Sequence, residues 1–556
     1  MVGLYRKSSG RGPGLMRSGV GAVPPVPECD VSIFCSRSSR DDRKDVMRPP
    51  TTPPAGPATP WTSVNPADLT DVVAERRLAG TEEFVAAARA AHEAQAGWAR
   101  RPAPQRGRVL ANVGRLVEAN KQALARVVTR EVGKPYAEAL GEVQEVIDTC
   151  DFFLGEGRRL YGQTVPSEMP DKHLFTYRKP LGTAVVVTAA NFPAAVPAWY
   201  LVPALLCGNT VVWKPSESAM AVADALASLF RAGGVPDDVL RVVHTDGTTA
   251  YAGLEEALDE GFVQKIGFTG STAVGRRVAE LAGRHLQAPC LELGGKNPLV
   301  VAEDADLELA VQGALFSAFA TAGQRCTSMG TAFVHRAVHG RFMESFVRAA
   351  ENLVVGDPTQ DVFYGPLIGE RYLEDFLKSL DLVQGHHTPA GSTATGRITS
   401  QQPRKGFVGD PDIGVYVHPT VVDGVRQDDA LYRQETFGPL VGVAVFDHLD
   451  EAVELANGHG YGLSAALYTR SPATAFSFRE RCSAGMLSIN NSTVGAEAHL
   501  PFGGNGMSGN GSRQSGIWVL DQFTSWQSVN WDHAGSLQKA QMDVEEVPAD
   551  MDFRLE

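Results

Sequence analysis

Apolar residues recur at three- and four-residue spacing along three long stretches in the first part of the chain. These stretches cover residues 82–99, 105–132 and 136–160. Such spacing gathers the apolar side chains on one face of a helix and leaves polar side chains on the other. The pattern predicts three helices that pack on one face against the rest of the protein.

Short β-rich runs follow, each separated from the next by a helical stretch. The first series comprises residues 184–187, 210–213, 239–243, 263–268 and 291–293, and the second begins at Pro298 and continues through residues 331–334, 441–446, 463–468 and 486–490. Strand–helix–strand alternation is typical of parallel, doubly wound sheets. We therefore expect an α/β protein with two domains of this kind.

The stretch between Lys179 and Lys214 contains no charged residue, so a hydropathy window would flag it as a membrane span. Pro193, Pro197 and Pro203 interrupt it and divide it into a strand, a turn, a helix and a second strand. We predict a buried core here and no membrane partner.

Residues 1–60 contain repeated proline and glycine, scattered arginine and no sustained apolar period. A segment of this kind buries too little surface to offset the entropy cost of ordering it. We predict a disordered extension without a secretory signal. Met47 offers a downstream start, so residues 1–46 need not belong to the native protein.

Hydrophobic residues form 43% of the chain and charged residues 21%, close to the averages of globular proteins. The net charge of −13 repels phosphate backbones, which argues against nucleic acid as a partner. Seven cysteines without Cys-x-x-Cys spacing predict reduced thiols in a cytoplasm rather than disulfides or structural zinc. His335 and His339 are four residues apart but lack an acidic neighbour and a third ligand, so no metal site is predicted.

Two segments after predicted strands could hold a dinucleotide, although the Gly-x-Gly-x-x-Gly fingerprint is absent. Lys214, Ser216 and Glu217 follow one strand at the carboxyl edge of the sheet, where ligands bind in open sheets. The charge of Glu217 would repel a 2′-phosphate, which favours NAD over NADP; a solvated loop before a helix is the alternative. Gly270 and Ser271 precede a helix whose N-terminus could receive a phosphate, or they form only a capping turn.

Three further residues suit chemistry at a carbonyl group. Cys326 lies in a polar loop beside Arg325, whose charge favours the reactive thiolate, and an inert loop thiol is the alternative. Glu292 follows apolar residues, so burial could raise its pKa into the range of a general base, or it pairs with Lys296. Asn191 offers an uncharged amide donor suited to an oxyanion, or simply forms a turn.

Taken together, these segments resemble the NAD(P)-dependent aldehyde dehydrogenase superfamily over residues 62–540. The blocks that carry the resemblance occur in the order of the family: Asn191-Phe192-Pro193, Lys214-Pro215-Ser216-Glu217, Phe268-Thr269-Gly270-Ser271, Glu292-Leu293-Gly294-Gly295-Lys296, Gly323-Gln324-Arg325-Cys326, Glu435-Thr436-Phe437-Gly438-Pro439 and Pro501-Phe502-Gly503-Gly504. The chain looks like a broad-range bacterial member, with some similarity to the aminoadipate-semialdehyde branch.

The resemblance implies a role for each matching residue. Cys326 would attack the aldehyde, Glu292 would activate the water that releases the acid, and Asn191 would hold the oxyanion with the backbone amide of Cys326. The cofactor NAD, with NADP as the alternative, would be bound by the following residues: Lys214, Ser216 and Glu217 at the adenosine ribose, Gly270 and Ser271 at the pyrophosphate, Glu435 at the nicotinamide ribose and Phe437 beside the ring.

The resemblance also implies a domain organisation and an oligomer. The NAD-binding Rossmann-like domain would comprise residues 61–163 and 182–294, and the catalytic domain residues 295–495. Residues 164–181 and 516–535 would form a small β-extension that joins subunits into a homodimer or homotetramer.

The substrate of such an enzyme is a small-molecule aldehyde. Phe192 and Trp199 would form an apolar wall, with Arg325 and Glu145 also near the substrate. In the aminoadipate-semialdehyde branch an acid at the position of Glu145 meets an amino group, and a solvated helical acid is the alternative. Many members carry Trp where this chain has Ala190, which widens one wall near the oxyanion site.

Two other classes of protein compete with the dehydrogenase. A cysteine hydrolase or acyl transferase would use Cys326 with a histidine and no dinucleotide, but none of the histidines lies in a motif that marks it as a partner. A binding protein that has lost activity would not need thiol, carboxylate and amide together. Formation of NADH in proportion to the aldehyde consumed distinguishes the three classes.

Overall fold

A parallel five-stranded sheet forms the first half of the fold. This computed structural model describes residues 60–391 and 394–555. The strands are β5 (Thr183–Val187), β6 (Thr210–Lys214), β7 (Leu240–Val242), β8 (Lys265–Thr269) and β9 (Cys290–Glu292), in the spatial order β7-β6-β5-β8-β9. The chain proceeds from β5 to β6 and β7 on one side, then returns to β8 on the other. The strand order therefore reverses between β5 and β8, where open α/β sheets bind ligands.

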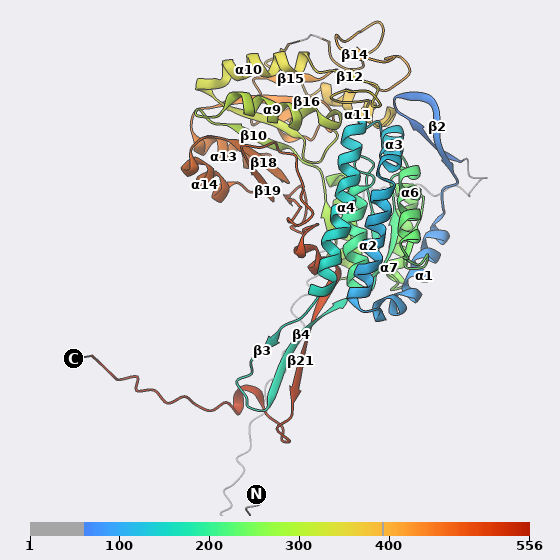
Figure 1. The fold of residues 1–556 in the computed structure, drawn as a ribbon. Helices are drawn as coiled ribbons and strands as arrows, with labels where there is room; N and C mark the ends of the chain where they lie inside the picture. Colours follow the sequence, from blue (N-terminus) through green and yellow to red (C-terminus); the bar gives the residue numbers. More distant parts are fainter. Residues whose placement is uncertain (1–59, 392–393, 556) are drawn as a thin grey trace, which may run out of the picture. The chain divides into compact units, whose positions relative to one another are not determined.

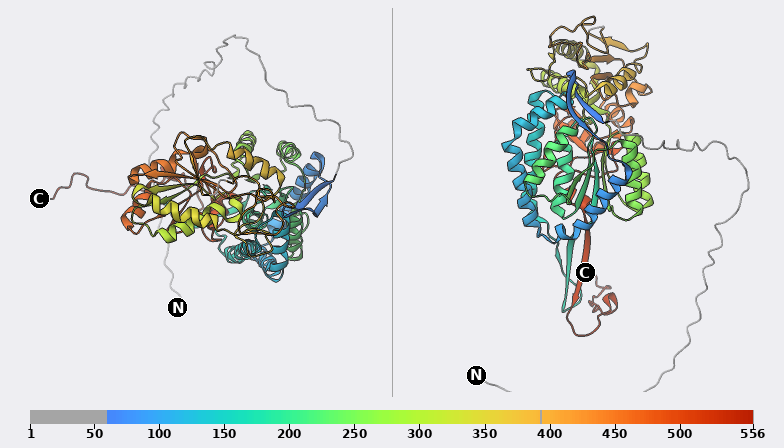
Figure 2. Two further views of the ribbon diagram at one scale, coloured as in Figure 1. Left: turned by 90° about the horizontal axis from the view of Figure 1, so that it is seen from above. Right: turned by 90° about the vertical axis from the view of Figure 1, so that its right-hand side faces the viewer.

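Helices cover both faces of this sheet (Figure 2). Alternate residues of β6 enter different cores: Val211 and Trp213 lie in one, and Val212 lies in the other. The face of Val212 packs on α1 (Thr81–Arg100), α7 (Gly247–Asp259) and α8 (Thr272–Arg284), and the opposite face packs on α5 (Ala195–Cys207) and α6 (Met220–Ala232).

A layer of long helices lies outside α5 and α6. It contains α2 (Ala103–Ala119), α3 (Lys121–Val132) and α4 (Tyr136–Arg159). The single helix predicted over residues 105–132 is wrong, because Asn120 leaves the helical backbone conformation with φ −108° and ψ 11°. Its side chain donates to the carbonyl of Leu116, which ends α2 before α3 begins.

A seven-stranded sheet forms the second half. Its order is β13 (Thr388–Ala390), β15 (Thr420–Asp423), β16 (Leu440–Phe446), β11 (Met329–His335), β10 (Asn297–Val301), β18 (Ser464–Tyr468) and β19 (Met486–Ile489). All pairs are parallel except β13 with β15. The helices of this half are α9 (Leu307–Phe319), α10 (Arg336–Glu351), α11 (Glu370–Leu380), α12 (Ala430–Arg433), α13 (Leu449–Gly458) and α14 (Pro472–Arg481).

The polar stretch 385–411 contributes β13 to the edge of this sheet. The described residues also form three two-stranded sheets: β1 (Trp61–Asn65) with β2 (Asp68–Arg76), β12 (Val355–Gly356) with β14 (Phe407–Val408), and β17 (Tyr461–Gly462) with β20 (Asn505–Gly506).

A narrow ribbon of three antiparallel strands projects from the five-stranded half (Figure 1). It consists of β3 (Thr164–Val165), β4 (Lys172–Pro180) and β21 (Thr524–Asp532). Within the segment 516–535, which was assigned to the β-extension, the residues before β21 form a 3₁₀ turn (Ile517–Val519) and α15 (Leu520–Phe523). Leu520 and Phe523 are buried against the core that contains α5, which favours the helical turn.

The predictions for the first sixty residues lie outside the described part of the chain, apart from Pro60. Among the described residues, none of the helices combines the length and apolar character needed to cross a bilayer. The uncharged stretch before Lys214 forms β5, α5 and most of β6, all buried.

Candidate active site

A cavity of about 540 Å³ lies at the reversal of strand order between β5 and β8. It brings together six of the residues singled out in the sequence, from segments far apart in the chain. They are Asn191, Gly270, Ser271, Cys326, Glu435 and Phe437. We call this cavity the cleft.

Cys326 is presented to the cleft by an unusual backbone. Thr321, Ala322 and Gly323 all have positive φ angles of 52°, 53° and 70° in the 3₁₀ turn Ala320–Gly323 that precedes it. Only glycine fits at position 323, because a Cβ there would lie 2.4 Å from the carbonyl oxygen of Gly438. Asn297 secures the other side of the loop, since its Nδ2 donates to the carbonyl of Cys326 at 2.8 Å. Left-handed residues of this kind store strain and cluster at functional sites.

The surroundings of Cys326 hold its thiol in the protonated form. Burial and the nearby carboxyls of Glu292 and Glu435 raise the pKa of the Cys326 thiol to about 12. Arg325 opposes this shift, as the sequence suggests, but its guanidinium forms an ion pair with Glu138. A base or another positive charge is therefore needed before the sulfur can react.

Asn191 lies just beyond the carboxyl end of β5 and is buried. Its Nδ2 donates to the carbonyl of Gln324 at 3.0 Å, two residues before Cys326. The amide is thus fixed to the loop of the cysteine, with a second hydrogen available to the cleft. The cleft-facing position suits a donor to an oxygen of a bound carbonyl compound.

Glu292 is the last residue of β9 and is almost completely buried. Within the described residues, Nζ of Lys296 has no hydrogen-bond partner, so the alternative ion pair with Glu292 is not formed. Burial raises the pKa of Glu292 well above its ordinary value, partly opposed by Arg513 and by the backbone amide of Gly504. A Cβ at Gly503 would lie 2.8 Å from Oε1, so glycine gives the carboxyl its room.

The segments predicted to bind a dinucleotide lie along the cleft and at one end of it. Ser271 caps α8, where its hydroxyl accepts from the amide of Val274. Lys214 and Glu217 form an ion pair with 3.0 Å between Nζ and Oε2. They do not line the cleft, but Tyr372, which does, is hydrogen-bonded through its hydroxyl to Ser216 and Ser218.

Glu435 and Phe437 form the wall opposite these segments. Oε1 of Glu435 accepts from the amide of Gly295 at 3.0 Å, and burial raises the pKa of this carboxyl to about 7. Phe437 has a φ of 38°, a strained value for a bulky residue. A polar carboxyl and an aromatic ring therefore face the same cavity.

Two further ionisable residues, Lys296 and His459, were not predicted to have a functional role. Burial lowers the pKa of Lys296 to about 7, and burial together with the charge of Lys296 lowers the pKa of His459 to about 4. Lys296 lies inside a quoted sequence block, so its position could have been noticed. His459 carries no local signal, because only the fold brings it near Lys296.

The residues predicted at the substrate lie on the other side of Cys326. The Phe192 ring is contacted by Nζ of Lys134, 3.6 Å from its centroid, and by the guanidinium of Arg325. Trp199 is buried against Phe502, with ring centroids 4.9 Å apart. These side chains pack near the thiol without lining the cleft.

Glu145 lies half-buried on α4 near this group. Its Oε2 has no partner among the described residues, and burial and Glu142 raise its pKa to about 7, opposed by Lys134 and Arg325. The alternative of a solvated helical acid does not describe this environment.

The histidines predicted not to bind metal make structural contacts. His335 caps α10, and Nε2 of His339 lies 3.1 Å from Asp423. The described residues contain one other cluster with the right ligand types, formed by His386, His387 and Asp429. Nδ1 of His387 accepts from the amide of Gln384, so its Nε2 carries a hydrogen toward Asp429 and offers no lone pair to an ion.

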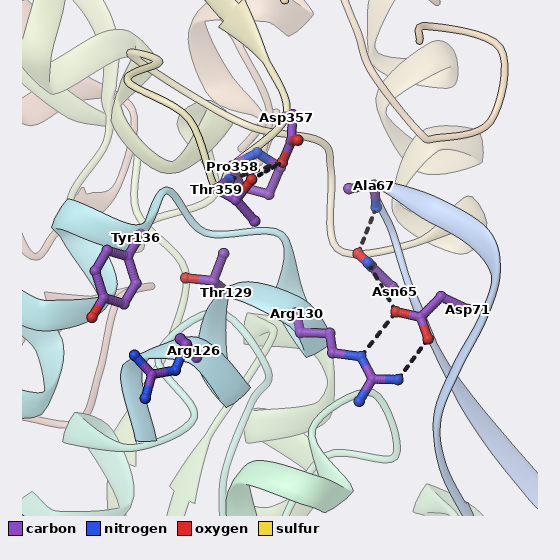
Figure 3. A pocket seen from close by; sticks show the side chains of 10 residues that line it. All are labelled: Asn65, Ala67, Asp71, Arg126, Thr129, Arg130, Tyr136, Asp357, Pro358 and Thr359. Carbon is purple, nitrogen blue, oxygen red and sulfur yellow. Dashed lines mark hydrogen bonds and ion pairs between the residues drawn. The ribbon is translucent and has the colours of Figure 1, made fainter. Parts of the chain in front are cut away.

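A second cavity, of about 480 Å³, lies between the β1–β2 turn, α3 and the loop after β12 (Figure 3). None of the residues predicted to function lines it. Its lining residues are Asn65, Ala67, Asp71, Arg126, Thr129, Arg130, Tyr136, Asp357, Pro358 and Thr359. We call it the outer cavity.

The sequence profile of the aldehyde dehydrogenase family matches residues 54–529, and the chain belongs to this family. It is similar to the α-ketoglutaric semialdehyde dehydrogenase of Bacillus subtilis, with 33% identity over 84% of this chain and 93% of the relative. The α-ketoglutarate semialdehyde dehydrogenase of Haloferax volcanii is 36% identical over 84% of this chain and 94% of the relative.

Solved structures show the same fold. PnpE from Pseudomonas sp. WBC-3 superposes with a TM-score of 0.81 at 30% identity, covering 87% of this chain and 96% of the other. An Escherichia coli NADP-dependent enzyme superposes with a TM-score of 0.79 at 31% identity, covering 85% and 95%. The expected fold class and family are thereby confirmed.

Proposed function

We propose that this protein oxidises an aldehyde to a carboxylic acid with NAD, through a covalent thioester on Cys326. The observation that supports it is that several functional groups line one cleft. They are a thiol, an amide donor, a helix N-terminus suited to a phosphate, and the wall formed by Glu435 and Phe437. The thiol, Asn191 and Ser271 come from three separate stretches of chain. Membership of the aldehyde dehydrogenase family supports the reaction class.

The first step is addition of the Cys326 sulfur to the aldehyde carbon, which gives a thiohemiacetal. The negative charge develops on the former carbonyl oxygen, where Nδ2 of Asn191 and the amide of Cys326 donate to it. When bound, NAD supplies a cationic ring that favours the thiolate and accepts the hydride that leaves the substrate carbon. Loss of the hydride from the thiohemiacetal leaves a thioester on Cys326.

The second step is hydrolysis of that thioester. Water is a weak nucleophile, so a base must take its proton as it attacks. Glu292 fits this role, because burial raises its pKa and no side chain of the described residues is hydrogen-bonded to its carboxyl. The carboxylic acid then leaves, and the Cys326 thiol is restored.

The cofactor-binding residues of the chain fit an NAD molecule. The helix terminus at Ser271 offers backbone amides to a pyrophosphate, and the second oxygen of Glu435 is available to a ribose hydroxyl. Lys214 is already neutralised by Glu217, which leaves no free charge there for a 2′-phosphate. PnpE, one of the similar structures, is described in complex with nicotinamide adenine dinucleotide.

A semialdehyde is the second candidate substrate class. The relatives from Bacillus subtilis and Haloferax volcanii are named as semialdehyde dehydrogenases, which supports a substrate with a second polar group. Glu145 is half-buried with Oε2 unpartnered and a pKa of about 7, so an ammonium group beside it would favour its ionised form. This supports an amino-semialdehyde such as aminoadipate semialdehyde.

A panel of aldehydes crossed with NAD and NADP, followed at 340 nm, tests the reaction and the cofactor together. We expect reduced cofactor in proportion to the acid formed, with NAD preferred. Ester or amide hydrolysis without any reduced cofactor would instead support the hydrolase. For the substrate, Glu145→Gln should raise KM for amino-aldehydes and leave hexanal unchanged, with exposed Glu118→Gln as the control.

We further propose a homo-oligomer built through the β3–β4–β21 ribbon. Among the described residues, strand β21 pairs with β4 alone, and Trp526 and Trp531 on it are exposed. At the far end of the seven-stranded sheet, β19 likewise has one neighbour. Two copies can therefore pair β21 of each with β19 of the other around a two-fold axis. The five described cysteines are all free, which supports a reducing, cytoplasmic location.

A further inference from the structure

The chain does not end with the ribbon but continues beyond it as an acidic tail, residues 533–555. The family match stops at residue 529, so the tail lies outside the part shared with the family. Figure 1 shows it leaving the end of the ribbon as a largely extended segment. It carries six large apolar side chains that are between 65% and 90% exposed: Leu537, Met542, Val547, Met551, Phe553 and Leu555.

The first part of the tail is fixed to the ribbon. The amide of His533 donates to the carbonyl of Asp171 at 2.9 Å, and Nε2 of Gln538 donates to the carbonyl of Pro170 at 2.9 Å. Farther along, Arg554 donates to the carbonyls of Met551 and Phe553, which holds the tail only to itself. The tail therefore starts from a defined point, while its apolar end is uncovered in the described chain.

This number of exposed apolar side chains favours burial against another surface, because removing each one from water lowers the free energy. The acidic residues of the tail disfavour an anionic lipid surface in that role. They are Asp543, Glu545, Glu546, Asp550 and Asp552. A protein surface with an apolar hollow is the occupant that fits this chemistry.

The same chain offers such a hollow beside β19. A cavity of about 380 Å³ is lined by Met486 and Leu487 of β19 and by Val494, Leu500 and Phe502 of the following loop. It adjoins the substrate side of the cleft, because Phe502 packs on Trp199 and Thr493 Oγ1 donates to the carbonyl of Thr327 at 2.7 Å. We call it the β19 cavity.

We propose that the tail of one copy covers the β19 cavity of a second copy, with Met551, Phe553 and Leu555 as its apolar contacts. The inference rests on the proposed pairing of β21 with β19 of the partner. That pairing delivers the first residues of the tail to the strand that lines the cavity. About 20 extended residues then span up to roughly 70 Å, ample to reach it. The tail so placed closes the aldehyde side of the partner's site, whereas the cofactor cleft opens elsewhere.

A triple variant, Met551→Ser, Phe553→Ser and Leu555→Ser, tests the cover in the full-length protein. We expect alkylation of Cys326 by a bulky maleimide to become about tenfold faster or more, because the loss of about 1.4 kcal/mol of apolar contact already gives a factor of ten. KM for an apolar aldehyde should change while KM for NAD does not. The matched control replaces polar neighbours: Glu545→Ser, Glu546→Ser and Asp550→Ser.

A cross-link tests the position directly. We expect Leu555→Cys together with Leu500→Cys to give a disulfide-linked dimer after mild oxidation, and neither single variant to do so. Unchanged alkylation together with no cross-link between copies overturns the proposal, even if aldehyde oxidation is normal. A cross-linked dimer without NADH formation would instead refute the proposed oxidation and leave the tail assignment standing.

Discussion

The cleft and the outer cavity have similar volumes, about 540 and 480 Å³, but the pKa values of their carboxyl groups are shifted in opposite directions. In the outer cavity Asp71 accepts from Nε of Arg130 at 2.9 Å, and this hydrogen bond lowers the pKa of the Asp71 carboxyl (Figure 3). In and beside the cleft, burial raises the pKa of Glu292 and of Glu435. A paired charge stabilises a fold, whereas a buried unpaired one destabilises it and is retained for chemistry.

The backbone shows the same contrast. Thr321, Ala322 and Phe437 near the cleft have positive φ, whereas every residue that lines the outer cavity has negative φ. Strain of this kind persists only where the surrounding structure enforces it. The volume of a cavity is therefore a poor indicator of a functional site. Backbone strain combined with buried carboxyls that lack an ion-pair partner is a better one.

The largest expected effect comes from Cys326→Ala. Aldehyde oxidation should fall by about 10⁴-fold or more, because the covalent route is lost. Cys482→Ser, a partly buried thiol away from the cleft, should retain full activity in the same assay of NADH formation. Equal activity of the two variants would remove the reason for distinguishing the cleft from the outer cavity.

Glu292→Gln should separate the two steps. We expect a rapid burst of NADH equal to the enzyme concentration, followed by turnover reduced by about 10²–10³-fold, since a general base acts only in hydrolysis. Stopped-flow absorbance resolves the burst from the steady rate. Glu480→Gln, an exposed carboxylate that lines neither the cleft nor the β19 cavity, serves as the control. A slow rate without a burst would instead indicate that Glu292 acts in the formation of the thioester.

Glu435→Gln should reveal the cost of burying this carboxyl. The folded state binds its proton more tightly than the unfolded chain, so stability is complete below the unfolded pKa of 4.5 and declines as pH rises through about 7. The glutamine variant should therefore be more stable than the parent by up to about 3 kcal/mol at pH 8 and not at pH 4.5. Thermal unfolding across pH measures the difference, and a pH-independent gap would contradict it.

Asp71→Asn should have the smallest effect. Because the Asp71–Arg130 pair is half-exposed, its loss should lower stability by about 1 kcal/mol or less. Activity should stay within about twofold of the parent, given that the outer cavity holds no reacting group. A large loss of kcat/KM with unchanged stability would show that the outer cavity takes part in function.

The sequence predicted the α/β architecture well, because short runs rich in β-branched and other apolar residues are distinct signals when helices separate them. It did not predict the break at Asn120 or the helical turns before β21. Both depend on contacts that no local pattern records: a side chain bonded to Leu116, and Leu520 buried against a distant helix. The antiparallel edge strand β13 was likewise hidden in a polar stretch.

Residue types and motifs indicated the candidate site, and the fold brings six of those residues to one cavity. Electrostatic detail could not be read from the chain. The pairing of Arg325 with Glu138 joins residues far apart in sequence, and the influence of Lys296 on His459 does too. The roles of the site residues stay predictions until the variants above are measured.

The contact between Gly323 and Gly438 has a consequence for how this protein can change. The loop that carries the thiol and the loop that carries Glu435 touch backbone to backbone, with no side chain between them to absorb an adjustment. A side chain introduced at position 323 would meet a main-chain oxygen, so no side-chain substitution in the other loop can make room for it. Such a substitution requires a shift of the backbone that carries Glu435 relative to the thiol.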